Sequence, residues 1–258
     1  MKRDLTQYTQ LIWYRAWGTL RSQVSRTYLN ALWWIIEPLI QMSAYYFVFS
    51  ELLNRRTGEY ALELLVGLAV VRWFSSAFSS AATSITGASG LMNLVDVRKI
   101  VFPLIQITSQ TIKSLIVFSL LTMMLLLTEH GQSLQAYLYL PGVMVATGLV
   151  IVGISLCYCA FVPFIADLAN LVGTLTTLVF FLSGVFFTID MMPANIQPYF
   201  YLNPIACSID MMRSIMLAGE IPNMGRLQYV AAFGLMSTLL GWQIIGFFDK
   251  VYPKVVVK

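Results

Sequence analysis

Long apolar runs constrain this chain more than any other feature of its sequence. Six of them are each about 20 residues or longer, the length that an α-helix needs to cross the hydrocarbon core of a bilayer. They lie at residues 31–53, 62–86, 104–128, 138–162, 168–188 and 227–248. Of the 258 residues, 11% are charged and 58% are hydrophobic, whereas a soluble domain carries about 25% charged residues. The sequence therefore predicts an all-α integral membrane protein, with six transmembrane helices in a single domain over residues 1–258.

Before the first run, residues 4–28 alternate apolar and polar side chains at helical spacing. Arg15 and Arg21 fall off the apolar stripe, and Trp13 and Trp17 flank it. Aromatic residues at headgroup depth and arginines near anionic lipid are typical of a helix that lies in the membrane interface. We expect an amphipathic interfacial helix that contacts membrane lipids. A juxtamembrane anchor with no further function is the alternative.

The basic residues indicate how the chain is oriented in the membrane. An even number of spans puts both termini on the same side. Cytoplasmic termini place ten basic residues inside and four outside. The ten are Lys2, Arg3, Arg15, Arg21, Arg26, Arg98, Lys99, Lys250, Lys254 and Lys258, and the four are Arg55, Arg56, Arg213 and Arg226. An excess of Lys and Arg marks the cytoplasmic side, so both termini are expected in the cytoplasm.

The segment between the fifth and sixth runs is too interrupted to span a bilayer and too apolar for an ordinary loop. Asp190 and Pro193 interrupt its first part. A short helix is expected after them, because Asn203 suits the N-cap, Pro204 the first turn and Gly219 the C-terminal stop.

This short helix has one polar and one apolar face. Asp210 and Arg213 are three residues apart and are expected to pair. At about 1.5 Å per residue, the helix covers only about 22 Å, less than the thickness of the hydrocarbon core. We therefore expect residues 188–222 to form short helices that re-enter the outer leaflet. A helix lying flat on the outer surface is the alternative.

Three charged residues lie well inside the predicted spans, away from their ends, and need an explanation. They are Glu37, Arg72 and Lys113, and the last two lie about ten residues into their spans, near mid-membrane. Intramembrane charges are costly and rarely face lipid. They either form an internal ion pair that fixes packing, or they line a path for an anionic passenger.

Several chemical signatures are missing from the sequence. It contains no GxxxxGK[ST] phosphate-binding loop, one histidine (His130), and three cysteines without metal-ligand spacing. It also lacks the dense basic patch of a nucleic-acid-binding protein. We expect no catalytic site, no metal, no cofactor in this chain and no nucleic-acid partner.

Three stretches in register resemble one family over essentially the whole chain. They are YLNALWWIIEPLIQMSAYYFVFSELL; LLVGLAVVRWFSSAFSSAATSI followed by GLMNLVDVRKIVFPLIQI; and FFLSGVFFTIDMMP followed by YLNPIACSIDMMRSIMLAG. Each resembles a signature of the permease subunits of ABC exporters for bacterial cell-surface polysaccharides. These are the O-antigen, capsule and teichoic-acid exporters.

The resemblance implies an assembly and an activity. The permease is expected to form a homodimer in the bacterial cytoplasmic (inner) membrane, with two copies of a separate ATPase that binds ATP and Mg. The passenger would be a lipid-linked glycan, and the chain itself would be a channel rather than an enzyme. A permease for a drug or small lipid is the alternative. A secondary transporter or membrane scaffold is disfavoured, because no internal repeat is visible.

The resemblance also assigns the loop after the second span, around residues 87–103, to contact with the ATPase. Apolar residues alternate there with charged ones, as in protein interfaces. The expected coupling residues are Leu91, Asn93, Leu94, Val95, Asp96, Arg98 and Lys99. A surface helix resting on lipid headgroups is the alternative.

Finally, the resemblance implies a passenger path and an outer gate. The path is expected to use aromatic faces, which offer a polymer many weak contacts, together with the intramembrane charges. Its residues would be Trp33, Trp34, Glu37, Tyr45, Tyr46, Arg72, Trp73, Lys113, Phe180 and Phe181. The gate would contain Asp190, Pro193, Asn203, Pro204, Asp210 and Arg213. The alternative for the aromatic residues is that they only seal helices against lipid.

Overall fold

The computed structural model describes residues 5–24, 58–92, 97–127, 134–187, 192, 193 and 195–256, together with seven single residues between 32 and 47. Every regular element in these ranges is helical, which confirms the all-α prediction. Most of the predicted first span, 31–53, lies outside the described residues.

Among the described residues, four helices are long and apolar enough to cross a membrane. They are α3 (Gly58–Ala82), α6 (Val101–Leu127), α8 (Leu140–Cys159) and α12 (Met224–Phe248). They occupy the second, third, fourth and sixth predicted spans, each shifted by a few residues. At the fifth position stands α9 (Asp167–Leu182), an apolar helix of only 16 residues.

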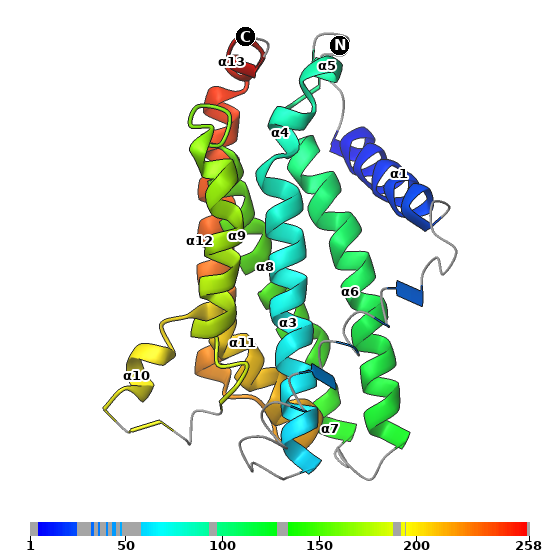
Figure 1. Cartoon of the computed structure of the whole chain (residues 1–258), viewed down its shortest axis with the longest axis vertical. Helices are drawn as coiled ribbons and strands as arrows, with labels where there is room; N and C mark the ends of the chain where they lie inside the picture. The colour runs from blue at the N-terminus through cyan, green and yellow to red at the C-terminus, as the bar shows by residue number, and fades with distance from the viewer. Residues whose placement is uncertain are drawn as a thin grey trace.

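The long helices run along the length of the bundle, and the short helices lie at its two opposite ends (Figure 1). At one end lie α4 (Ser84–Gly87), α5 (Ser89–Met92) and α13 (Tyr252–Val256). At the other lie α7 (Leu134–Tyr137), α10 (Gln197–Phe200), α11 (Pro204–Arg213) and the π-helix η4 (Ser214–Ala218). We call these the α13 end and the α11 end. Helices α3, α6, α8, α9 and α12 pass alternately between them, as the predicted order of spans requires.

Helix α1 (Leu5–Val24) lies obliquely against α6 (Figure 1). Its apolar stripe faces the protein, with Ala16 and Leu20 buried, whereas Trp13 and Trp17 are exposed on the other side. The helix and the division of its faces are confirmed. Its position in the membrane interface stays a prediction.

Helices α8 and α12 pack unusually close together because glycines line their contact. A Cβ on Gly234 would lie 2.8 Å from the Leu149 Cβ, and one on Gly241 would lie 2.6 Å from the Leu156 Cβ. Small residues allow two helix backbones to approach in this way. The Thr238 hydroxyl also donates to the Leu149 carbonyl, at 3.0 Å. The two helices therefore form one rigid unit.

Helix α3 packs through the small residues of its second half. The stretch SSAFSSAATSIT is rich in small residues, which allow close helix packing, and Ala77, Ala81 and Ala82 are buried. A hydrogen bond of 3.0 Å from the Gln110 amide to the Ser80 hydroxyl joins this face to α6.

Candidate functional site

One arginine holds the segment that follows α9. The Arg213 guanidinium donates four hydrogen bonds to main-chain carbonyls. Its Nη2 donates to Val185 at 2.7 Å, and its Nη1 donates to Gly184 at 2.9 Å and to Phe187 at 3.3 Å. Its Nε donates to Glu63 of α3 at 3.0 Å. Arg213 thus joins α11, α3 and residues 184–187.

The segment that Arg213 binds also shows that the predicted fifth span was too long. The sequence predicted a helix over 168–188, but α9 ends at Leu182. Gly184 then adopts φ 71°, a left-handed conformation that glycine accommodates without steric cost. Main-chain carbonyls in the turn that follows a helix need donors when they are buried, and Arg213 supplies donors to three of them, at residues 184, 185 and 187.

Burial and the nearby carboxylates shift the pKa of Arg213 in opposite directions. Burial lowers the pKa of its guanidinium below the ordinary value, whereas the nearby Glu63 and Asp210 carboxylates raise it. A buried guanidinium is costly unless its donors are satisfied. The four carbonyls accept from four of its five N–H groups, so the arginine can remain charged within the protein.

Asn203 joins the start of α11 to the end of α9. Its carbonyl oxygen accepts from the Ile205 and Ala206 amides at 3.0 and 3.4 Å, which confirms the predicted N-cap. Its amide donates to the Leu182 carbonyl at 3.2 Å. At the other end, Gly219 has φ 65°, which confirms the predicted C-terminal stop.

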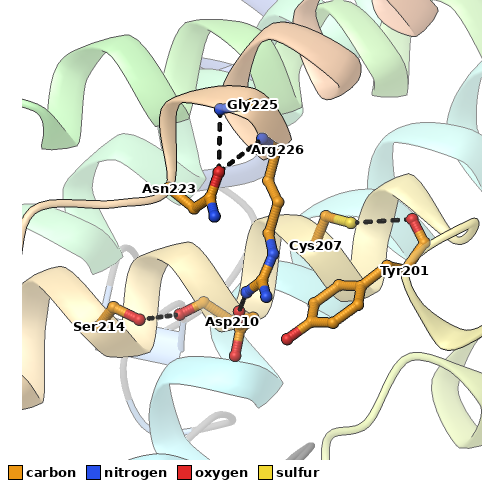
Figure 2. A network of polar contacts seen from close by, with 7 residues as sticks. All are labelled: Tyr201, Cys207, Asp210, Ser214, Asn223, Gly225 and Arg226. Carbon is orange, nitrogen blue, oxygen red and sulfur yellow. Dashed lines mark hydrogen bonds and ion pairs between the residues drawn. The ribbon is translucent and has the colours of Figure 1, made fainter. Parts of the chain in front are cut away.

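Asp210 pairs with a different arginine from the one the sequence suggested. Its carboxylate accepts from Arg226 at the start of α12 (Figure 2). The Arg213 guanidinium donates instead to main-chain carbonyls. The Arg226 guanidinium also lies over the Tyr201 ring, 3.7 Å from the centroid. Asp210 acts on Arg213 through its charge, as the i,i+3 spacing suggested, but its ion pair is with Arg226, because the chain turns between α11 and α12.

Arg72 and Lys113 come together, as their predicted depths suggested. Both line a cavity of about 120 Å³ between α3 and α6. Ser76, Gln110 and Ser114 also line it. Two cationic groups and three neutral hydrogen-bonding groups are a set that suits an anion such as a phosphate.

The aromatic residues of the predicted path differ in exposure. Trp73 borders the cavity but is 3% exposed, and its Nε1 donates to the Thr111 hydroxyl at 3.1 Å. Phe181 is 56% exposed on α9 and makes an edge-to-face contact with Phe180. Trp33 is exposed. The buried position of Trp73 suits packing, whereas Phe181 is open to an outside partner.

The expected ATPase-contacting segment is described only in part. Leu91 lies in α5, and Arg98 is exposed, with its guanidinium 5.9 Å from the centroid of the Tyr8 ring of α1. The sequence grouped Lys99 with the contact residues, but its side chain is buried beside Asp249. Met92 and Ile100 are buried as well, within the apolar cluster of the α13 end.

Some predicted site residues lie outside the described residues. They are Trp34, Glu37, Tyr45, Tyr46, Asn93, Leu94, Val95, Asp96 and Asp190. Of the remaining gate residues, Pro193 is exposed and accepts from the Ile196 amide at 2.9 Å, and Pro204 is buried in the first turn of α11.

Comparison with known proteins identifies the family. A family model described as an ABC-2 type transporter matches residues 10–217. The chain belongs to the ABC-2 type transporter family. Relatives include an O-antigen export system permease protein RfbA of Klebsiella pneumoniae, 21% identical over 87% of this chain and 86% of the relative. The RfbA permease of Myxococcus xanthus is 24% identical over 96% of this chain and 95% of the relative. The polysialic acid transport protein KpsM of Escherichia coli is 24% identical over 86% of this chain and 87% of the relative. These relatives confirm the resemblance to polysaccharide-export permeases.

Two functional candidates escaped the sequence analysis. Arg226 and Asp249 stand at the two ends of α12, where the sequence showed only charges flanking an apolar run. Charges at span ends usually face headgroups or water, so nothing local distinguished these two.

Proposed function

We propose that this ABC-2 permease is the channel subunit of an ATP-driven exporter, and that it moves a lipid-linked polysaccharide across the bacterial cytoplasmic membrane. The observation that carries the proposal is the match to the curated relatives. It covers nearly the whole chain, and each relative is named for transport of a surface polysaccharide. The chain would act as a homodimer with two copies of a separate ATPase, which would bind the ATP and Mg.

We further propose that the α13 end faces the cytoplasm. Among the described residues of that end, Arg98, Lys99, Lys250 and Lys254 are basic. The excess of cations supports this orientation by the positive-inside rule. The α11 end then lies on the outer side, and its short helices re-enter the outer leaflet as the gate.

The cavity of Arg72 and Lys113 would receive the anionic group of the lipid anchor. The two residues lie near the middle of α3 and α6, about where an unpaired negative charge meets its greatest cost in the membrane. Cationic side chains there lower that cost as the anchor passes. Phe180, Phe181 and Trp33 would offer the sugar rings weak and repeated contacts.

The test is export of surface glycan by cells that carry Arg72→Gln, Trp73→Ala or Tyr45→Ala in place of the natural chain. Membrane abundance and ATPase binding are measured alongside. We expect Arg72→Gln to reduce export about tenfold at normal abundance, equivalent to about 1.4 kcal/mol of lost stabilisation. Lys250→Gln, a charge loss at an exposed position of the α13 end, is the control and should export normally.

Three results would speak against the proposal. Normal export by all three variants would remove the path assignment. Losses that follow lower abundance would favour a packing role for these residues. Unchanged surface glycan in cells that lack the chain, with loss of a drug or small-lipid efflux, would favour the alternative exporter.

A further inference from the structure

We propose that α12 is a rigid rod that transmits movement of the ATPase-contacting segment to the outer gate, with Asp249 and Arg226 as its two linkage residues. The inference rests on the proposed function for the assignment of the two ends. It adds a route between them and names the residues that connect it.

The first link is at the α13 end, where Asp249 caps the last turn of α12. Its Oδ1 accepts from the Lys99 main-chain amide at 2.7 Å, and its Oδ2 lies 4.0 Å from the Lys99 Nζ. Lys99 directly follows Arg98 in the turn that opens α6. A displacement of the contact segment therefore acts on α12 through a charged hydrogen bond as well as on α6 through the main chain.

A pocket beside this link leaves room for such a displacement. It has a volume of about 270 Å³, and Arg98, Trp242 and Asp249 are among the residues that line it. The Lys99 side chain is 7% exposed and that of Asp249 is 28% exposed. The Lys99–Asp249 contact is thus largely shielded from solvent, which strengthens it. The pocket leaves one side of the contact without close packing.

The body of α12 is suited to carry the movement without bending. It runs unbroken over 25 residues, about 37 Å at 1.5 Å per residue. Its contact with α8 is fixed by the close approach at Gly234 and Gly241. Closely packed helices move together or shift in discrete steps, because interdigitated contacts do not deform smoothly.

The second link is at the α11 end of the same helix. Arg226 lies in the first turn of α12, pairs with Asp210 of α11 and covers the Tyr201 ring (Figure 2). One turn further along α12, the Tyr229 hydroxyl donates to the Leu202 carbonyl at 2.7 Å. From α11, Arg213 continues the connection to residues 184–187. Both links are thus charged contacts from the ends of one helix to the segments that the exporter must move together.

Spatial continuity alone does not establish coupling, so the test measures coupling directly. The permease is purified with its ATPase, reconstituted in proteoliposomes, and carries Tyr199→Cys as a reporter on α10, where Tyr199 is 73% exposed. A membrane-impermeant maleimide labels the thiol from the outer side, with ATP and vanadate or without nucleotide. We expect trapping to change the labelling rate about fivefold or more, the lower end of the range for coupled sites.

Two variants each break one link. We expect Asp249→Ala, which removes both oxygens that contact Lys99, and Arg226→Gln to abolish most of the nucleotide-dependent change in labelling, while ATP hydrolysis and co-purification with the ATPase stay within about twofold, below 0.5 kcal/mol. Arg226→Lys retains a cation that can pair with Asp210, so it should keep the response. Lys250→Gln and Glu220→Gln remove exposed charges near the two links and should also keep it.

A full nucleotide-dependent response in Asp249→Ala and Arg226→Gln would contradict the proposal that α12 transmits the movement. If the labelling rate of Tyr199→Cys in the otherwise natural chain is the same with and without nucleotide, both the proposed transmission through α12 and the proposed gate are contradicted. A responding reporter in a complex that exports no glycan would leave the rod standing and remove the proposed passenger. The passenger and the route are therefore tested separately.

Discussion

The two ends of the bundle both bury apolar side chains, but they differ in how many polar contacts are added to that packing. At the α13 end, an apolar cluster that includes Ile85, Leu156 and Ile245 surrounds Tyr252. At the α11 end, the apolar face of α11 is also buried in the core, and polar contacts are added to it: four carbonyls bind Arg213, and Asp210 binds Arg226.

This difference shows how one chain can combine an end that keeps its packing with an end that can be docked or released. Apolar contacts are non-directional, so a cluster that is moved as a unit keeps its packing. Hydrogen bonds to main-chain carbonyls have strict geometry, so a segment held by them is either docked or released. The α13 end is therefore suited to carry a partner, and the α11 end is suited to open and close.

The largest effect is expected from Arg213→Met, which removes the donor at the α11 end. Four carbonyls then lose their partner, and we expect the free energy of unfolding to fall by about 3 kcal/mol or more. Thermal unfolding of the purified permease in detergent measures the change. Arg213→Lys, which keeps the charge but not the fork of donors, should lie between this variant and the wild type. An unchanged melting temperature in Arg213→Met would mean that the carbonyls do not depend on it.

A smaller effect is expected from Gly241→Val, which acts on the helix pair between the ends. A Cβ there lies 2.6 Å from the Leu156 Cβ, so α8 and α12 must separate. We expect a loss of about 2 kcal/mol, as for other overpacked contacts. Gly246→Val is the matched control, because a Cβ at Gly246 meets nothing within 4 Å. Equal losses in the two variants would contradict a close α8–α12 contact.

The smallest effect is expected at the α13 end from Tyr252→Phe. The tyrosine is fully buried, and its hydroxyl donates to the Ala160 carbonyl at 3.1 Å. Burial also raises the pKa of this hydroxyl above its ordinary value, so it stays a neutral donor throughout the physiological range. The variant keeps the apolar ring and should lose only about 1 kcal/mol. A loss as large as that of Arg213→Met would contradict the contrast between the ends.

Local features of the α11 end could be predicted from the sequence. Asn203, Pro204 and Gly219 mark the limits of a helix by rules that act within a few residues, and all three were predicted correctly. The long helices followed from runs of apolar residues, because span length is set by the bilayer.

The long-range contacts could not be predicted in this way. The true partners of Arg213 lie 26 to 29 residues away in 184–187 and 150 residues away at Glu63. Lys99 and Asp249 are likewise 150 residues apart. The end of α9 at Leu182 was hidden for a related reason. Gly184 stands within a run of apolar residues, and composition alone does not distinguish a turn held by a buried arginine from a continuing helix.

The central claim is that this chain carries a lipid-linked polysaccharide outward, and one measurement tests it most directly. Surface glycan and intracellular lipid-linked glycan are quantified in cells that lack the chain but keep its ATPase, and again after the natural chain is restored. In cells that lack the chain, we expect surface glycan to disappear and lipid-linked glycan to accumulate on the cytoplasmic side. We expect restoration of the chain to reverse both changes. Unchanged surface glycan without internal accumulation would contradict it.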